Sequence, residues 1–166
     1  MTVGTLARRG RPLYLSLMYS FVLAAHNIVR WVVLLTGVIA LLNSYRGLLT
    51  GAAWTPRDRT IAAAYANTFG LQFLLGLLLY VWLSPVTRTG FGNMGAAMRD
   101  PAIRLFVIEH PLAMFVGLAL AHIALARTRK AATDAARWRI AAILLTLSLL
   151  LVLARTPWMR PMFPAF

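Results

Sequence analysis

Cysteines and acidic residues are the scarce components of this sequence. The 166-residue chain has no cysteine and only four Asp and Glu residues. The lack of cysteine excludes disulfides, thiolate metal sites, cysteine nucleophiles and covalent haem attachment through CxxCH. The sequence also lacks a paired-carboxylate site, a glycine-rich phosphate loop, HExxH and GxSxG. It therefore contains no catalytic constellation of the kind that soluble enzymes use.

Charge is scarce overall, and apolar residues are abundant. Charged residues make up 13% of the chain and hydrophobic residues 60%, against about 25% and 45–50% in soluble domains. The apolar residues form four long runs, and about 20 such residues suffice to cross a bilayer as a helix. We therefore predict one all-α domain over residues 1–166, an up-and-down four-helix transmembrane bundle, as a multi-pass protein of the bacterial cytoplasmic (inner) membrane. The expected segments are helices at about 14–42, 61–83, 103–126 and 138–156, an N-terminal extension 1–13, a short interfacial helix within 92–100 and a Pro-rich tail 157–166.

The few charges present are mostly of one sign. Seventeen Lys and Arg residues give a net charge of +13, and nearly all lie at the ends of the apolar runs. This placement favours contact with anionic lipid headgroups, so the predicted partner is the lipid bilayer and not nucleic acid. Most tryptophans also lie near segment ends, as in an interfacial aromatic belt: Trp31, Trp54, Trp82, Trp138 and Trp158.

Polar residues interrupt the apolar runs at a few positions. The stretch "AAHNIVRWVV" holds His26, Asn27 and Arg30, and ionisable residues at membrane depth are functional candidates. His26 lies 16 residues before the expected end of the first helix, and His110 lies 16 residues before the expected end of the third. Both are then roughly 24 Å from the same membrane face. Because the first and third helices are often diagonal in such a bundle, we expect the two imidazoles to face each other.

Two facing imidazoles in an apolar core are typical of a b-type haem with two axial histidines. We predict one haem b, with its iron bound by His26 and His110 and with Gly76 and Gly117 leaving room for the ring. Arg30, one turn from His26, is predicted to bind a haem propionate or to pair with Glu109. A hydrogen-bond network, a chlorin, a quinone or a metal ion are the alternatives for the pair.

The remaining intramembrane polar residues have structural interpretations. Gln72 and Asn67 are expected to form hydrogen bonds across helices, in a polar core shared with Glu109. His122 has no second histidine at its level, so we predict an interfacial side chain and no second bis-histidine haem.

Three sequence stretches carry a resemblance to a known family. "HNIVRW", "LQFLLGLLLY" and "FVIEHPLAMF" resemble small four-helix bacterial membrane proteins commonly labelled cytochrome b-like, over about residues 18–158. The family pattern is matched by these residues: His26, Arg30 and Trp31; Gln72, Gly76 and Tyr80; Glu109, His110 and Pro111. The chain is also loosely similar to cytochrome b561 proteins, which commonly use more than one histidine pair, whereas this chain has one. The resemblance implies membrane haem binding.

The predicted function is that of a membrane electron-transfer subunit in a larger respiratory or photosynthetic complex. Other membrane subunits, and a quinone or neighbouring cytochrome, would be its partners, and it would not be a stand-alone enzyme. The alternative is a cofactor-free accessory subunit whose polar core specifies helix pairing and which docks on and stabilises such a complex. A third interpretation is ligation of a bacteriochlorophyll by one of the histidines.

Overall fold

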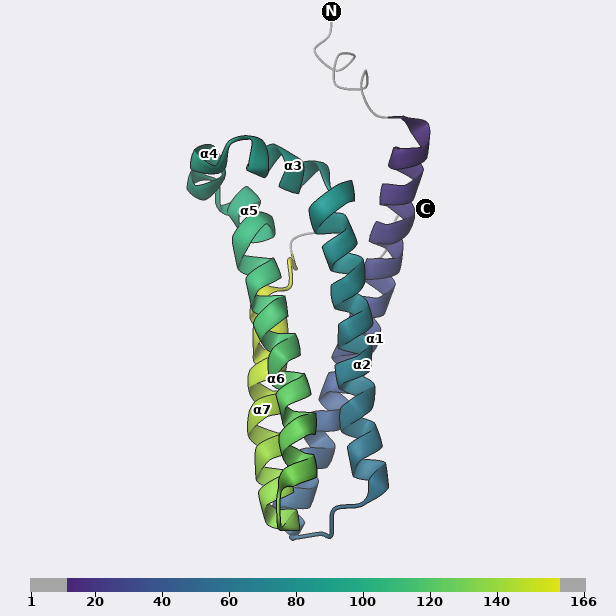
Figure 1. Cartoon of the computed structure of the whole chain (residues 1–166), viewed down its shortest axis with the longest axis vertical. Helices are drawn as coiled ribbons and strands as arrows, with labels where there is room; N and C mark the ends of the chain where they lie inside the picture. The colour runs from purple at the N-terminus through teal and green to yellow at the C-terminus, as the bar shows by residue number, and fades with distance from the viewer. Residues whose placement is uncertain (1–11, 159–166) are drawn as a thin grey trace, which may run out of the picture.

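Helices account for nearly all of the chain that the computed structural model describes, residues 12–158 (Figure 1). No strand occurs within this range. The parts of the predicted N-terminal extension and tail at residues 1–11 and 159–166 lie outside the described residues. The elements are α1 (Leu13–Thr50), α2 (Pro56–Leu78), the π-helical stretch η2 (Leu79–Leu83), α3 (Pro85–Gly92), α4 (Met94–Arg99), α5 (Pro101–Arg104), the π-helical stretch η3 (Leu105–Glu109), α6 (His110–Lys130) and α7 (Asp134–Arg155).

Four helical segments in the described range are long and apolar enough to cross a membrane. They are Leu13–Thr50, Pro56–Leu83, Pro101–Lys130 and Asp134–Arg155, and they contain the four predicted apolar runs. Many large apolar side chains on them point outward; Leu35, Leu74, Phe115 and Leu150 are all more than half exposed. Such outward-facing side chains are unfavourable in water and favourable in lipid.

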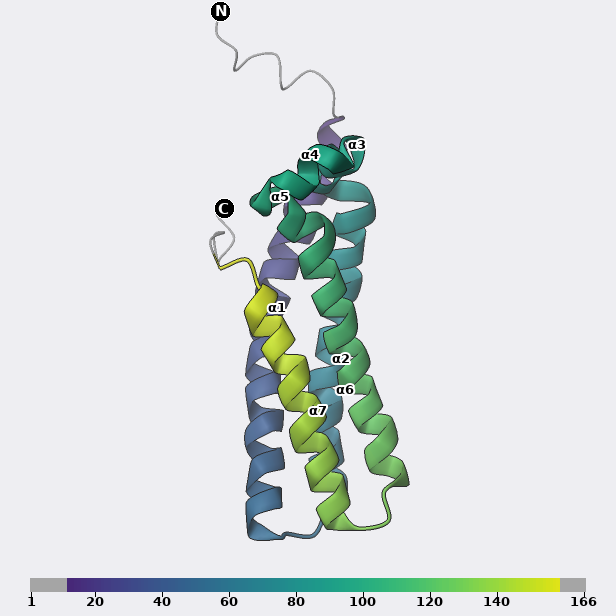
Figure 2. The same cartoon turned by 90° about the vertical axis from the view of Figure 1, so that its left-hand side faces the viewer.

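The four long helices lie side by side along the long axis of the molecule (Figures 1 and 2). The main contacts of α1 are with α2 and α7, and those of α6 are also with α2 and α7. Therefore α1 and α6 occupy opposite corners, which is the diagonal relation expected for the first and third long helices. The short helices α3, α4 and α5 cross one end of the molecule (Figure 1), and α4 lies where a short helix was predicted.

The helix ends differ from the ends of the apolar runs because capping residues set them. The first helix continues eight residues past the predicted end at residue 42 and stops at Gly51, whose φ of 65° is left-handed. The second begins five residues before residue 61, at Pro56, because Thr55 and Asp58 form a capping box. The last begins four residues before residue 138, where the Thr133 side chain accepts a hydrogen bond from Ala136 N–H.

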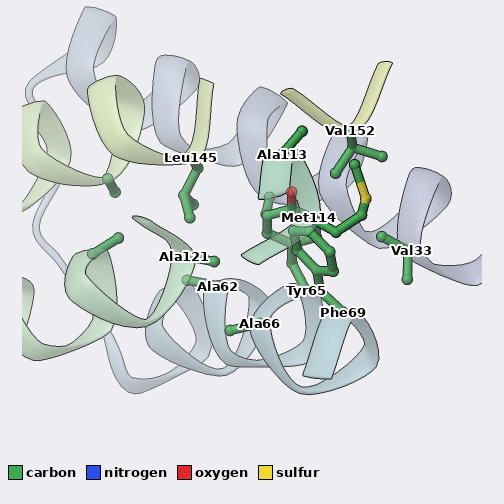
Figure 3. Close-up of a cluster of buried hydrophobic side chains, with 13 residues drawn as sticks. Val33, Ala62, Tyr65, Ala66, Phe69, Ala113, Met114, Ala121, Leu145 and Val152 are labelled. Carbon is green, nitrogen blue, oxygen red and sulfur yellow. The ribbon is translucent and has the colours of Figure 1, made fainter. Parts of the chain in front are cut away.

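A cluster of buried side chains fills the space between the long helices (Figure 3). Its polar centre joins three of them. Ser148 Oγ on α7 donates to Gly117 O on α6 at 2.7 Å, so Ser148 accepts from the Tyr65 hydroxyl on α2 at 2.8 Å. Tyr65 and Ser148 are fully buried. These two bonds fix the relative positions of α2, α6 and α7.

The end of the molecule opposite α3–α5 is closed by Trp138. The prediction that this residue belongs to a lipid-facing aromatic belt is wrong: its side chain is 1% exposed. Its indole Nε1 donates to Ala52 O at 2.7 Å, and its ring packs on Trp54 with centroids 4.4 Å apart. The side chain of Trp138 fills the space beside Gly47 of α1, where any Cβ would collide with the indole.

Candidate functional site

The imidazoles of His26 and His110 face each other from opposite corners of the helix assembly. His26 lies in the middle of α1 and His110 is the first residue of α6. Their ring centroids are 6.5 Å apart and the ring planes are inclined at 72°. Counting residues along the two helices placed both rings at one level, and the structure brings them together at that level.

A cavity of about 930 Å³ lies beside this histidine pair. Its wall is mainly aliphatic and aromatic, and no Asp or Glu of the described chain lines it. Besides the histidines, the wall includes Arg30, Gly76, Phe69, Phe73, Met114 and Val33, and it extends to Tyr19 and Thr87 near α3. A large apolar cavity with a few convergent polar groups is the usual form of a cofactor site.

The ring of His110 is oriented by the end of α7. His110 Nδ1 lies 2.8 Å from Arg155 O. A carbonyl oxygen can only accept, so Nδ1 carries the proton and Nε2 keeps its lone pair. A backbone carbonyl bound to one ring nitrogen, with the other nitrogen free, is the arrangement that orients metal-binding histidines.

The backbone before His110 is irregular, and Tyr80 supports it. The stretch η3 immediately precedes His110, and such π-helical turns within α-helices are frequent at functional sites. Pro111 has no N–H to offer to Val107 O, one helical turn earlier. The Tyr80 hydroxyl donates to Val107 O at 2.9 Å, and Thr87 Oγ1 donates to Tyr80 O at 2.9 Å. These bonds join η2, α3 and η3 at the end of the cavity.

The surroundings of His26 come from one face of α2. Gln72 Nε2 donates to His26 O at 3.0 Å, which ties α2 to α1 at the level of the histidine. One turn later, a Cβ on Gly76 would lie 3.1 Å from His26 Cε1, so the glycine lets the imidazole lie against the helix. His26 Nδ1 is buried and has no hydrogen-bond partner among the described residues.

Arg30 lies on the cavity wall, but its predicted pairing with Glu109 is wrong. Arg30 is 6% exposed, and its Nη1 donates to Asn27 Oδ1 at 3.3 Å. Glu109 instead accepts from Arg104 Nε at 2.7 Å, and its other oxygen lies 3.8 Å from Arg155 Nη1. Glu109 closes η3 on the side of α5 and the end of α7, where these two cations are nearer than Arg30. It therefore belongs to a partly exposed ion cluster and not to a polar core.

Three other predictions concern residues away from the cavity wall. Asn67 is exposed, so its assignment to the polar core is wrong; five residues along a helix turn it about 140° from the buried Gln72. Gly117 does not line the cavity: its Cβ position lies 3.2 Å from the ring of Phe69. It therefore allows helix contact and makes no room for a ligand. His122 is exposed, in agreement with the expectation of an outward-facing residue.

Sequence reasoning missed the roles of Thr87 and of the Arg155 carbonyl. The only signal for the former was Ser84-Pro85, which marks a helix start whose first turn contains Thr87. No sequence signal marks the Arg155 carbonyl, because backbone atoms carry no residue identity.

Comparisons with known proteins return no match. No family model, curated protein or solved structure matches this chain. The described residues contain no group of three or more His, Cys, Asp and Glu side chains that could hold a metal ion. The function must therefore be argued from the histidine pair and its cavity.

Proposed function

We propose that this chain is a membrane-embedded b-type haem protein, an electron-transfer subunit of a larger bioenergetic complex in the bacterial cytoplasmic membrane. One observation carries the proposal: two imidazoles from diagonal helices face each other, 6.5 Å apart, at a large apolar cavity. Haem iron takes axial ligands from its two sides, and the macrocycle needs an apolar slot. Both requirements have a counterpart here.

The separation of the rings suits a shared metal ion. Imidazole nitrogens bind metal ions at about 2 Å, so two rings on opposite sides of one ion have centroids about 6 Å apart. The observed 6.5 Å is close to this value. Two histidines in hydrogen-bond contact would instead be linked through their nitrogens, whereas His26 Nδ1 has no partner among the described residues and His110 Nδ1 is bonded to Arg155 O.

The residues around the pair have distinct roles in this proposal. His26 and His110 would hold the iron, and the Arg155 carbonyl keeps the proton of His110 on Nδ1. Arg30 adds positive charge to the cavity wall and would hold a propionate by its guanidinium. Gly76 lets His26 lie close to α2. When bound, haem supplies one-electron redox chemistry, and the apolar wall excludes water from it.

The membrane arrangement is part of the same proposal. We infer an up-and-down four-helix transmembrane bundle, supported by the four apolar helices, their neighbour contacts and the short α1–α2 and α6–α7 connections. The outward-facing leucines and phenylalanines support contact with lipid or with other membrane subunits.

Visible spectroscopy of the purified protein tests the proposal. We expect a reduced-minus-oxidised b-type α band that is lost in His26→Ala and in His110→Ala. His122→Ala is the matched control: it removes the third histidine, which is exposed and outside the cavity, and we expect it to retain the band. A folded, colourless wild-type protein would refute haem binding and favour the cofactor-free accessory subunit. A near-infrared band would favour a chlorin.

A further inference from the structure

A second pocket lies at the other end of the molecule from α3–α5, where the connections between the long helices meet (Figure 1). Its volume is about 370 Å³. Its wall consists of Trp54, Arg59, Thr128, Arg129 and Arg137. Three of these five residues are arginines, so the pocket differs in chemistry from the apolar cavity beside the histidines.

Three helix ends form this pocket. Arg59 lies in the first turn of α2, Arg129 in the last turn of α6 and Arg137 in the first turn of α7. Trp54 forms part of the wall and is held by its ring contact with the buried Trp138. The three guanidinium groups therefore come from elements that are distant in sequence and held together by the fold.

The local charge balance leaves the pocket positive. The carboxylate of Asp58 accepts hydrogen bonds from Thr55 and Asn43, and that of Asp134 pairs with Arg137 at 2.7 Å. The side chains of Arg59 and Arg129 make no hydrogen bond or ion pair with any described residue. Two of the three guanidinium groups thus remain available to an anion, without competition from these two carboxylates.

We propose that this pocket binds the phosphate of an anionic phospholipid. Guanidinium groups match phosphate oxygens in geometry, and basic pockets between membrane helices bind lipid headgroups. The pocket lies at the ends of three segments able to cross a membrane, which is the level of lipid phosphates. Trp54 adds the amphipathic ring that proteins place at this level. The inference rests on the membrane arrangement proposed above and not on haem.

The chain itself provides a matched control. Each pocket arginine has another arginine two residues away that does not line the pocket: Arg57 beside Arg59, Arg127 beside Arg129 and Arg139 beside Arg137. The triple variant R59Q/R129Q/R137Q can therefore be compared with R57Q/R127Q/R139Q. Both remove three positive charges from the same helix ends, so general attraction to an anionic lipid falls equally in the two.

Native mass spectrometry of the full chain in a neutral detergent measures lipid binding. We expect one tightly bound phosphatidylglycerol in the wild type, and much weaker binding of phosphatidylcholine. The pocket variant should bind phosphatidylglycerol about tenfold or more weakly than the control variant. Should the pocket triple variant fail to fold by circular dichroism, the single variants Arg129→Gln and Arg127→Gln provide the same comparison.

Three outcomes would overturn the inference. Equal loss in both variants would mean a diffuse basic surface, and no loss in either would mean that the pocket is not the site. Displacement of the lipid by equimolar inorganic phosphate or glycerol phosphate, again dependent on the pocket arginines, would assign the site to free phosphate. Each of these results is compatible with an intact haem band, so the failure of this inference is distinguishable from failure of the haem proposal.

Discussion

The hydroxyl of Tyr80 supplies a hydrogen bond that Val107 O cannot take from the residue one turn later, because that residue is Pro111. Tyr80→Phe removes this bond and little else. An interhelical hydrogen bond in a membrane protein contributes about 0.6 kcal/mol on average and about 1.7 at most. Val107 is fully buried, and a buried carbonyl left short of a donor costs about 1–3 kcal/mol. We therefore expect a loss of about 1–2 kcal/mol in the free energy of unfolding.

A double-mutant cycle tests the stated cause. Pro111→Ala restores an N–H that can donate to Val107 O in the ordinary helical pattern. In that background Tyr80→Phe should lose no more than about 0.5 kcal/mol, which gives a coupling of about 1 kcal/mol between two side chains. The coupling is the informative quantity, because it does not depend on the separate effect of each substitution on the helix.

Unfolding by a denaturing detergent in mixed micelles, followed by circular dichroism, measures these free energies. Tyr45→Phe is the control: its hydroxyl pairs with Thr146 Oγ1 at 3.1 Å on an exposed face, and we expect a loss below about 0.5 kcal/mol. Equal effects at Tyr80 and Tyr45, or additive effects of Tyr80→Phe and Pro111→Ala, would refute the reasoning.

Two further predictions concern the packing of the long helices. Gly47→Ala should destabilise by about 1–3 kcal/mol because the added methyl collides with the buried, hydrogen-bonded Trp138, whereas Gly70→Ala, with open space around its Cβ position, should stabilise by about 0.5–1 kcal/mol; a stabilising Gly47→Ala in the same unfolding assay would show that the indole can move aside. Ser148→Ala should lose about 1–2 kcal/mol because the buried Tyr65 hydroxyl loses its acceptor, and adding Tyr65→Phe should lose little more. Full additivity of this last pair would contradict the shared hydrogen bond.

Residue counting along helices predicted the closest feature of the candidate site. His26 and His110 were placed at one depth from the residue count alone, because helical rise is nearly constant and errors of a residue shift a side chain by only about 1.5 Å. The same reasoning located Gly76 beside His26. Facing across a diagonal followed from the order of the four long segments, which the neighbour contacts reproduce.

Predictions that depended on side-chain partners were less successful. Glu109 found Arg104 and Arg155 because the short helix before η3 and the end of α7 bring cations close to it, and neither position follows from depth. Gly117 and Asn67 were assigned from their positions in the helical repeat, without knowledge of which neighbour each face would meet. The burial of Trp138 required Gly47, 91 residues earlier, and no local pattern connects the two.

The π-helical stretch before His110 also determines how the end of the molecule is turned relative to the rest. Such a stretch amounts to one extra residue in an α-helix, and one residue corresponds to a rotation of about 100°. The azimuth of α5 and the beginning of η3 about the helix axis is thus decoupled from that of α6. Arg104 can face Glu109 while His110 faces the cavity, although an uninterrupted helix could not present both in these directions. The extra residue acts as a phase shift between an ion-paired rim and a buried histidine.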